Sequence, residues 1–317
     1  MRSGVWANSV RKSISPQSLS EDLRAFLFEK GADLVGFGCI ERLEGTPELH
    51  HPRRYLPETR SMISIALRIN DAVCDMIARC TWKHEDPPSY NSFQLFTLAV
   101  INPQLDELAY QAAKFLECRG YKAYPFPANL PHDLKPSPGY PGGVADVSHK
   151  HIAVACGLGQ IGWHTMLLTP QFGSRQKLTS IATHAPLVPD PMIEGKLCDP
   201  ERCGFLCARS CPTEAIPRDV EKRVSIKMGD QAVEYSEIVG WRCRWGCSGM
   251  LKCTGGYRDI PMPDAEPSDD ALMRHRARID PWQNRITHLV GLVPYCGRCF
   301  SVCPEPRGIE AHKSSLT

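Results

Sequence analysis

The feature that most constrains this chain is a pair of cysteine-rich runs that end in the same way. The first run, at residues 197–212, reads LCDPERCGFLCARSCP, and the second, at residues 295–304, reads YCGRCFSVCP. Each run closes with Cys-x3-Cys-Pro. The seven thiols are those of Cys198, Cys203, Cys207, Cys211, Cys296, Cys299 and Cys303. Such close spacing predicts thiolate-bound metal centres rather than cysteines that only fill a core.

The spacing suits [4Fe–4S] clusters, because each of the four irons binds one thiolate and a single loop can reach several irons. The common bacterial pattern is C-x2-C-x2-C-x3-C-P, in which the last cysteine binds the other cluster of a pair. The first run here is C-x4-C-x3-C-x3-C-P, and the second is C-x2-C-x3-C-P. The two runs therefore predict a ferredoxin-like module that carries two [4Fe–4S] clusters.

Two clusters need eight thiolates, and the two runs supply seven. The eighth is expected from residues 241–253, which offer Cys243, Cys247 and Cys253, and we favour Cys243. One cluster is then predicted on Cys198, Cys203, Cys207 and Cys303, and the other on Cys211, Cys243, Cys296 and Cys299. A zinc site at C-x4-C-x3-C, and one cluster in place of two, are the open alternatives.

Charge and hydropathy indicate a cytoplasmic protein without a membrane partner. The 317 residues include 37 basic and 35 acidic ones, so no strong field predicts nucleic-acid or membrane binding. The N-terminal segment has no apolar leader core and no twin arginine, and no stretch approaches the ~18 apolar residues of a membrane span. In the cytoplasm, fifteen cysteines favour metal or redox sites over disulfides.

Hydrophobic periodicity predicts a mixture of helices and strands. Helices are expected at residues 18–30 and within residues 92–119, and strands at residues 32–38, 61–68, 121–125 and 179–183. Residues 125–143 form a loop rich in Pro and Gly, and loops of this length are usually functional or disordered. A boundary near Pro189 predicts one domain at residues 1–190, a two-cluster domain at residues 191–310 and a tail at residues 311–317.

A glycine-rich stretch, CGLGQIGWHT at residues 156–165, precedes the cysteine runs. Gly157, Gly159 and Gly162 have the G-x-G-x-x-G spacing of dinucleotide-binding turns. That interpretation is weak, because no apolar strand precedes the glycines and no acidic residue follows about 20 positions later. From these residues alone, a tight turn packed against a neighbouring element is the simpler interpretation.

The longer stretch SHKHIAVACGLGQIGWHTMLLTPQFGSRQKLTSIATHAPLVPD, followed directly by the first cysteine run, resembles the epoxyqueuosine reductases and the reductive dehalogenases. GADLVGFG and HPRRYLPETRSMISIAL are also similar to this group, so the resemblance spans most of residues 18–306. It implies an α+β fold, in which a nitroreductase-like, corrinoid-binding domain precedes the ferredoxin-like domain. It also implies cobalamin beside Ser148, Gly157, Leu158, Gly159, Gly162 and Thr165.

The function implied by the resemblance is a cobalamin-dependent iron–sulfur oxidoreductase that reductively cleaves, deoxygenates or dehalogenates an organic substrate. The alternatives are an epoxyqueuosine reductase acting on tRNA and an electron-transfer protein with clusters but no corrinoid. Two positions depart from the group: Trp163 stands where Lys or Arg is common, and Asp146 lies closer to the GLG core than the proton-donating Asp of the epoxyqueuosine reductases. An external electron donor such as ferredoxin or flavodoxin is expected, and homodimers are common among nitroreductase-like folds.

Reductive cleavage also needs a proton donor near the substrate. The candidate acids are Tyr140, Asp146, His149, His151 and His164, each of which could instead be a hydrogen-bonded structural residue. Arg175 and Lys177 are interpreted either as solvated surface charges or as partners of corrin amides or a phosphate.

Overall fold

The architecture is built on an antiparallel four-stranded sheet in the order β1-β2-β6-β3. The structure is a computed structural model, and it describes residues 14–79, 93, 95–128, 145–247, 251, 260–268, 271 and 296–305. The strands are β1 (Leu34–Cys39), β2 (Ser61–Arg68), β3 (Ala123–Phe126) and β6 (Gln176–Thr183). The predictions on Tyr140 and Cys253 lie outside the described residues.

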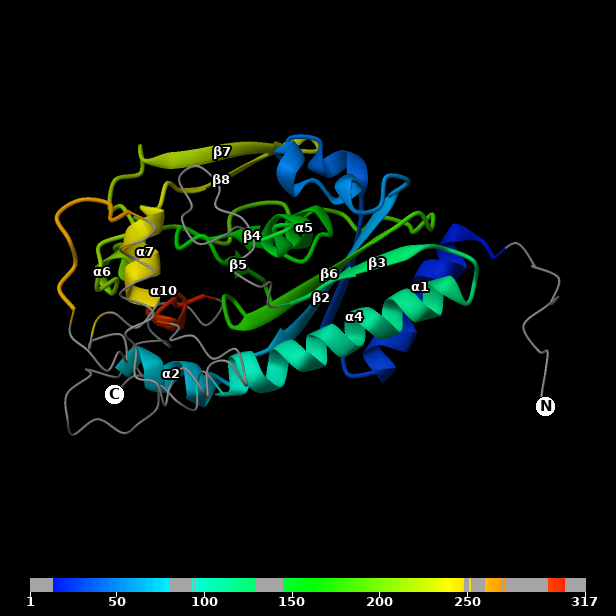
Figure 1. Ribbon diagram of the computed structural model, residues 1–317, viewed down its shortest axis with the longest axis horizontal. Helices are drawn as coiled ribbons and strands as arrows, with labels where there is room; N and C mark the ends of the chain where they lie inside the picture. The colour runs from blue at the N-terminus through cyan, green and yellow to red at the C-terminus, as the bar shows by residue number, and fades with distance from the viewer. Residues whose placement is uncertain are drawn as a thin grey trace.

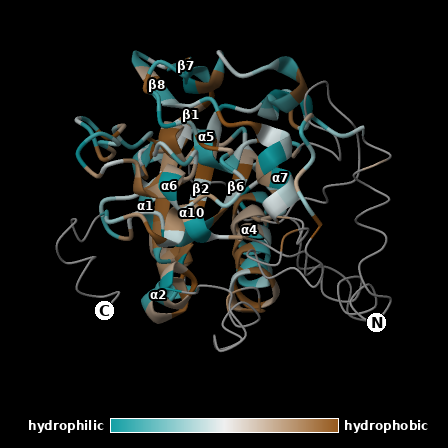
Figure 2. Cartoon of the chain, turned by 90° about the vertical axis from the view of Figure 1, so that its left-hand side faces the viewer, coloured by the Kyte–Doolittle hydropathy of each residue, from teal (hydrophilic) through white to brown (hydrophobic). Residues whose placement is uncertain are grey.

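Strand β2 is central in the sheet, and both of its faces are buried. Ile63 and Ile65 pack in the apolar core on one face, whereas Met62 and Ala66 pack in the core on the other face. Successive side chains of a strand point to opposite faces, so a strand covered on both sides is apolar almost throughout. This explains the sequence SMISIALR, of which all but the last residue is buried. Figure 2 shows the hydrophobic character of the central strands.

Helices α1 (Pro16–Glu29) and α4 (Asn102–Glu117) cover one face of the sheet (Figure 1). Ser15 begins α1, because its hydroxyl accepts a hydrogen bond from the Ser18 amide at 3.1 Å. Leu19, Leu23 and Leu27 recur every four residues and form the buried stripe of this helix. A π-helical segment, η4 (Leu95–Ile101), leads into α4, and α2 (Asp71–Arg79) follows β2.

The opposite face is covered by α5 (His149–Ala155) and by a hairpin of β7 (Arg223–Met228) and β8 (Gln231–Ser236) (Figure 1). Gly229 forms the hairpin turn with a φ of +57°, and Met228 and Val233 reach the core. Between α5 and the hairpin lie the short strands β4 (Gln160–Ile161) and β5 (Leu167–Leu168). Three single-turn 3-10 helices follow β1: η1 (Ile40–Leu43), η2 (Glu48–His50) and η3 (Pro52–Arg54).

The elements that bear the clustered cysteines gather at one end of the molecule (Figure 1). They are α6 (Leu206–Arg209), α7 (Gly240–Cys247) and α10 (Arg298–Ser301), and α10 contacts both α6 and α2. Contacts also cross the boundary expected near Pro189: Asp190 pairs with Arg24 at 2.7 Å, and the Ser174 hydroxyl donates to the Phe300 carbonyl at 2.8 Å. The division into two domains stays a prediction.

The mixed helix-and-sheet class expected from the sequence is confirmed. The predicted strand at residues 61–68 coincides with β2, and the predicted helix at residues 18–30 corresponds to α1. The β7–β8 hairpin lies in a stretch to which the sequence analysis assigned no element. Among the described helices, none combines the length and the apolar character needed to cross a membrane.

Candidate functional site

The two cysteine runs meet through their short helices, each of which begins at a residue with left-handed backbone. Phe205, with a φ of 55°, begins α6, which carries Cys207, and Gly297, with a φ of 65°, begins α10, which carries Cys299. Left-handed backbone costs a residue other than Gly about 1 kcal/mol or more. The turn at Phe205 is therefore held by the surrounding packing rather than by local preference.

The first cysteine group consists of Cys198, Cys203, Cys207 and Cys303. Burial raises the pKa of the Cys207 thiol, and the nearby charges of Cys303, Cys198 and Cys203 raise that pKa further. Burial also raises the pKa of Cys303 to about 12, and Cys198 and Cys203 add to the increase. These mutual effects place the four thiols in one neighbourhood.

The second cysteine group consists of Cys211, Cys243, Cys296 and Cys299. Burial raises the pKa of Cys299, and the nearby charges of Cys243, Cys296, Cys207 and Cys211 raise it further. Burial likewise raises the pKa of Cys296 to about 12, with added contributions from Cys211 and Cys243. Because the charge of Cys207 also raises the pKa of Cys299, the two groups are adjacent.

Cysteines of both predicted groups lie in one region, where Cys198, Cys207, Cys211 and Cys299 share an apolar cluster, and their division into two sets of ligands stays a prediction. Cys247 lies one helical turn beyond Cys243 on α7, with the two sulfurs 3.9 Å apart. A hydrogen bond with the Cys247 thiol is the main cause of the raised pKa of Cys243, ahead of burial. Cys243 and Cys247 are therefore neighbours, and only the pKa effects on Cys296 and Cys299 associate Cys243 with the second group.

Backbone amides donate hydrogen bonds to several of these sulfurs. The amide of Trp163 donates to Cys198 Sγ at 3.2 Å, and the amide of Ala215 donates to Cys211 Sγ at 3.3 Å. Amide donors favour the thiolate over the thiol, and the thiolate is the form that binds iron. Where burial has raised the pKa, metal binding must displace a proton.

The donor set fits iron–sulfur clusters better than a single ion. Within the described part of the chain, no three Cys, His, Asp or Glu side chains lie close enough together to hold one metal ion. Tetrahedral zinc brings its sulfurs to within about 3.8 Å of each other, since each Zn–S bond is about 2.3 Å. A cubane binds each thiolate to a different iron, so its ligating sulfurs stand farther apart. Eight thiols would supply the four thiolates that each of two cubanes needs.

The glycine-rich stretch packs against the protein's own backbone. A Cβ on Gly157 would come within 2.3 Å of the Pro191 carbonyl oxygen, and one on Gly159 within 2.0 Å of the Leu168 carbonyl oxygen. At Gly162 the nearest atom would be Leu168 Cδ1 at 2.9 Å. The interpretation as a packed turn therefore accounts for all three glycines. These positions offer no open cradle for a corrin, so corrinoid contact there stays a prediction.

The other residues predicted to lie beside a corrin are also occupied by protein contacts. Leu158 is in the core, with 8% of its surface exposed. Ser148 stands before α5, and its hydroxyl is 2.6 Å from His151 Nδ1. His151 Nε2 is in turn 3.1 Å from the Tyr235 hydroxyl on β8, so this chain of contacts connects α5 to the hairpin.

Thr165 lies in a turn that brings His164 into the interior. Its φ is 63°, a left-handed value that is a genuine outlier for a β-branched residue. Both Thr165 and His164 are buried. Strained backbone of this kind persists only where the surroundings enforce it, and it is concentrated at functional sites.

Among the candidate acids, Asp146 has a partner that the sequence analysis missed. Burial and the nearby Asp146 carboxylate raise the pKa of Tyr55 to about 12. Tyr55 also packs against Tyr124 and Phe126 of β3. Because Tyr55 and Asp146 are far apart in sequence, only the fold could reveal the pair.

His149 is a hydrogen-bonded neutral residue. Its Nδ1 is 2.8 Å from the Ser180 hydroxyl and its Nε2 is 3.0 Å from the Pro127 carbonyl. Burial lowers the pKa of His149 to about 4, and burial followed by the charge of Lys150 does the same for His151. A neutral imidazole whose nitrogens both have partners is a poor proton donor at neutral pH.

The prediction that Arg175 is a surface charge is wrong. Arg175 is 2% exposed and pairs with Asp71 at 3.0 Å and Asp75 at 2.7 Å. Lys177 on β6 is half-buried, and burial lowers its pKa to about 8. The alternative role of Arg175 and Lys177, as partners of corrin amides or a phosphate, stays a prediction.

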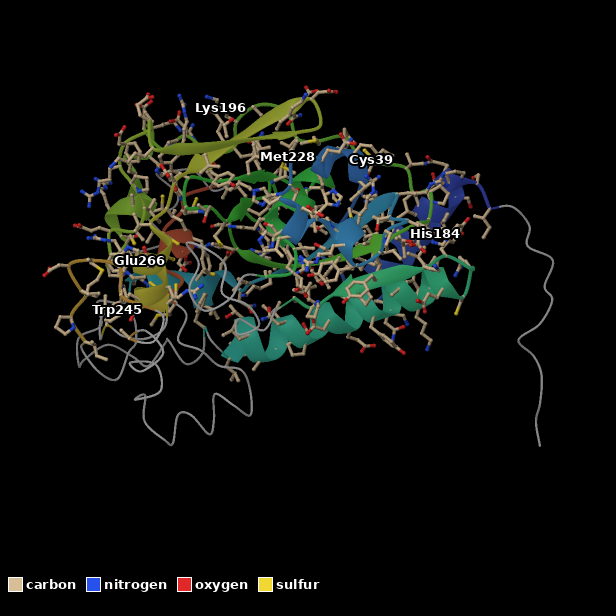
Figure 3. All side chains as sticks on the ribbon, turned by 45° about the horizontal axis from the view of Figure 1, so that its top comes forward. Cys39, His184, Lys196, Met228, Trp245 and Glu266 are labelled. Atoms are coloured by element: carbon tan, nitrogen blue, oxygen red, sulfur yellow. The ribbon has the colours of Figure 1, made fainter. Side chains whose placement is uncertain are left out.

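A cavity of about 670 Å³ adjoins the first cysteine group. Trp163 and Cys198 line it, together with charged side chains from the loop at residues 193–201 and from the hairpin, including Lys196, Arg223 and Glu234. Lys196 is labelled in Figure 3. This cavity gives solvent access to the neighbourhood of Cys198.

The fold is similar to those of reductive dehalogenases and epoxyqueuosine reductases. The structure is similar to a catabolic reductive dehalogenase in complex with 3-bromo-4-hydroxybenzoic acid, with a TM-score of 0.56 and 18% identity over 95% of this chain and 34% of that chain. It is also similar to an epoxyqueuosine reductase solved with a modified tRNA stem loop, with a TM-score of 0.50 and 16% identity over 95% of this chain and 80% of that chain. The resemblance expected from the sequence is confirmed.

Two curated sequences with local similarity to this chain are also reductive dehalogenases. The chain is 29% identical over 160 residues to tetrachloroethene reductive dehalogenase from Sulfurospirillum multivorans, which covers 49% of this chain and 23% of the relative. A relative of the same name from Desulfitobacterium hafniense is 30% identical over 118 residues, which cover 37% of this chain and 18% of the relative. The chain thus spans less than a quarter of the length of these curated relatives. No protein-family profile matches it.

Proposed function

We propose that the chain is an iron–sulfur, cobalamin-dependent oxidoreductase that reductively cleaves an organic substrate. The observation that carries this proposal is that cysteines from three separate segments lie close enough to raise one another's pKa. The reductive activity is supported by the relatives, which are named as reductive enzymes.

In this proposal each cysteine group holds one [4Fe–4S] cluster. When bound, the clusters supply one-electron transfers between an external donor, such as ferredoxin or flavodoxin, and the substrate. The chain itself buries the thiols, supplies amide donors to their sulfurs and keeps the two groups adjacent. Burial and hydrogen bonds to sulfur are the properties that set the reduction potential of such clusters.

The corrinoid part of the proposal rests on the relatives. One similar structure, with a TM-score of 0.53 and 17% identity over 93% of this chain and 38% of that chain, is described by its title as suggesting a mechanism for B12-dependent dehalogenation. The packing of Gly157, Gly159 and Gly162 against the protein's own atoms does not support a corrin at these positions.

Proton delivery is assigned to the pair of Tyr55 and Asp146. The Asp146 carboxylate raises the pKa of Tyr55, so the Tyr55 phenol keeps its proton at neutral pH and is available as a donor. Asp146 also lies directly beyond the long Pro- and Gly-rich loop in the sequence. Tyr55→Phe tests this assignment, because it should slow turnover while leaving both clusters in place.

The test of the proposal is a cobalamin titration of the anaerobically reconstituted protein, followed by assay of halide release from a brominated phenol. Binding should shift the visible spectrum of cobalamin toward the base-off form, and turnover with a low-potential donor should release halide. No spectral change at a large excess of cobalamin would contradict the corrinoid part of the proposal. It would favour an electron-transfer protein that carries clusters but no corrinoid.

A second candidate function is epoxyqueuosine reduction on tRNA. It is favoured by the coverage of 80% of the epoxyqueuosine reductase chain, compared with 34% of the dehalogenase chain. Measured at physiological salt, tight binding of a queuosine-family tRNA stem loop would support this function, whereas binding lost between 50 and 200 mM salt would indicate nonspecific contact.

A further inference from the structure

Trp163, in the glycine-rich stretch, contacts a clustered thiol directly. Its backbone amide donates a hydrogen bond to Cys198 Sγ at 3.2 Å. The hydroxyl of Ser236, the last residue of β8, donates a hydrogen bond to the Trp163 carbonyl oxygen. These two bonds hold the backbone of Trp163 beside Cys198 independently of the indole ring.

The indole ring of Trp163 packs against the first cysteine run. Its Nε1–H donates to the Pro217 carbonyl oxygen at 2.8 Å, and the ring meets that of Phe205 in a T-shaped contact with 6.1 Å between centroids. Trp163 is 7% exposed and belongs to the same apolar cluster as Cys207, against which Cys198 also packs. A large side chain whose polar atom has a partner is firmly placed, which a wall beside the thiols requires.

Trp163 also borders the cavity of about 670 Å³. Cys198 and Val220 line the cavity beside it, and Val220 packs against the apolar cluster of Trp163 as well. The lining includes the exposed charged residues Lys196 and Arg223, and charged groups of this kind retain water. Trp163 therefore lies between a hydrated cavity and buried thiols.

We propose that Trp163 seals the iron–sulfur cluster held through Cys198 from the water of the cavity. The inference rests on the proposed function, because it requires a cluster bound by Cys198 and Cys207. The amide of Trp163 fixes the Cys198 sulfur, and the indole ring fills the space through which water from the cavity would approach the cluster.

The seal has two measurable consequences. Water stabilises the reduced cluster more than the oxidised one, because the reduced cluster carries one more negative charge. An apolar wall that excludes water therefore lowers the reduction potential of the cluster behind it. The wall also obstructs dissolved molecules, so a chelator that enters the cavity should reach the iron only slowly.

Three variants isolate the contribution of the ring. Trp163→Ala removes the wall and leaves both backbone hydrogen bonds possible, whereas Trp163→Phe keeps an aromatic ring and loses the bond to Pro217. Phe26→Ala is the matched control, because it also removes a packed aromatic ring: Phe26 of α1 lies 4.9 Å from Phe115 between ring centroids. Figure 1 shows α1 far from α6, the helix that carries Cys207.

The test combines an EPR-monitored redox titration of the reconstituted protein with the anaerobic rate at which a chelator removes its iron. We expect Trp163→Ala to make reduction of one cluster about tenfold more favourable, which raises its potential by about 59 mV for one electron. About four of the eight irons should also be removed several times faster than from the wild type. Trp163→Phe should stay close to the wild type in both measurements, and Phe26→Ala should change neither. A general loss of stability would not raise the potential of a single cluster.

Unchanged potentials and chelation rates in Trp163→Ala, with both clusters present, would overturn the inference, as would equal changes in Trp163→Phe and Trp163→Ala. If Trp163→Ala binds no iron, Trp163→Leu decides: a raised potential of one cluster supports the seal, and an unchanged potential overturns it. A wild-type protein that binds no cluster would instead refute the proposed function, so the two failures are distinguishable.

Discussion

Arg175 donates from Nη2 to the Asp75 carboxylate at 2.7 Å, and the same nitrogen lies 3.3 Å from the carbonyl oxygen of Ser301. Ser301 stands between Cys299 and Cys303 in the second run. One buried guanidinium thus joins α2, the start of β6 and α10, the helix that carries Cys299. This contact fixes the second cysteine run against the sheet.

Arg175→Met should strongly destabilise the protein, because it removes the guanidinium that pairs with the Asp75 carboxylate, whose side chain is 13% exposed. Breaking a buried ion pair from one side costs about 3–5 kcal/mol. Anaerobic chemical denaturation measures the loss. Arg53→Met is the control: Arg53 pairs with exposed Glu41 at 3.4 Å, and such surface pairs contribute about 0–1 kcal/mol. Equal losses in the two variants would contradict the role given to Arg175.

Cys243→Ala should remove one cluster, and Cys247→Ala should leave both. The two thiols share one face of α7, but only the charge of Cys243 contributes to the raised pKa values of Cys296 and Cys299. Iron analysis after anaerobic reconstitution should give about four irons for Cys243→Ala and about eight for Cys247→Ala. The reverse pattern would assign Cys247 to the second group, and retention of eight irons by both variants would direct attention to Cys253.

Gly159→Ala should destabilise the protein whether or not cobalamin is present. Its Cβ would meet the Leu168 carbonyl oxygen at 2.0 Å, so the backbone must shift, at a cost of about 3 kcal/mol or more. Gly31→Ala is a control for backbone strain alone: Gly31 has a φ of +98° and no atom within 4 Å of the added Cβ, and about 1–2 kcal/mol is expected. A stable Gly159→Ala protein that merely fails to bind cobalamin would favour the corrin interpretation of this glycine.

Stability should fall as the pH decreases from about 6.5 toward 4, in part because of His149. Burial lowers its folded-state pKa to about 4, below the ordinary value of 6.5, so between these values the unfolded chain binds a proton that the folded chain does not. The contribution of neutral His149 is complete above pH 6.5 and decreases by about 1.4 kcal/mol per pH unit below it. His149→Gln should reduce the stability difference between pH 7 and pH 5 by about 2 kcal/mol; an unchanged difference would show that His149 does not titrate in this way.

The sequence predicted the elements whose local pattern agrees with their packing. β2 was predictable because SMISIALR is apolar on both faces, and α1 because Leu19, Leu23 and Leu27 recur every four residues. The β7–β8 hairpin was also open to prediction, since RVSIKM alternates polar and apolar residues before a Gly-Asp turn, but the analysis left that stretch unassigned.

Contacts between distant segments could not be predicted in the same way. The thiol spacing indicated the two cysteine groups, because sulfur chemistry limits which residues can share a cluster. Nothing in the local sequence marks Tyr55 as the partner of Asp146, or Arg175 as the partner of Asp75. His164 Nε2 has no hydrogen-bond partner among the described residues, and this depends on packing that only the three-dimensional structure shows.

The most direct test of the account is the iron and acid-labile sulfide content of the anaerobically reconstituted protein. Two cysteine groups of four thiols predict about eight irons and about eight sulfides per chain, decreasing to about four of each in both Cys198→Ala and Cys296→Ala. About four irons in the wild-type protein, or bound zinc without sulfide, would contradict the assignment of two clusters.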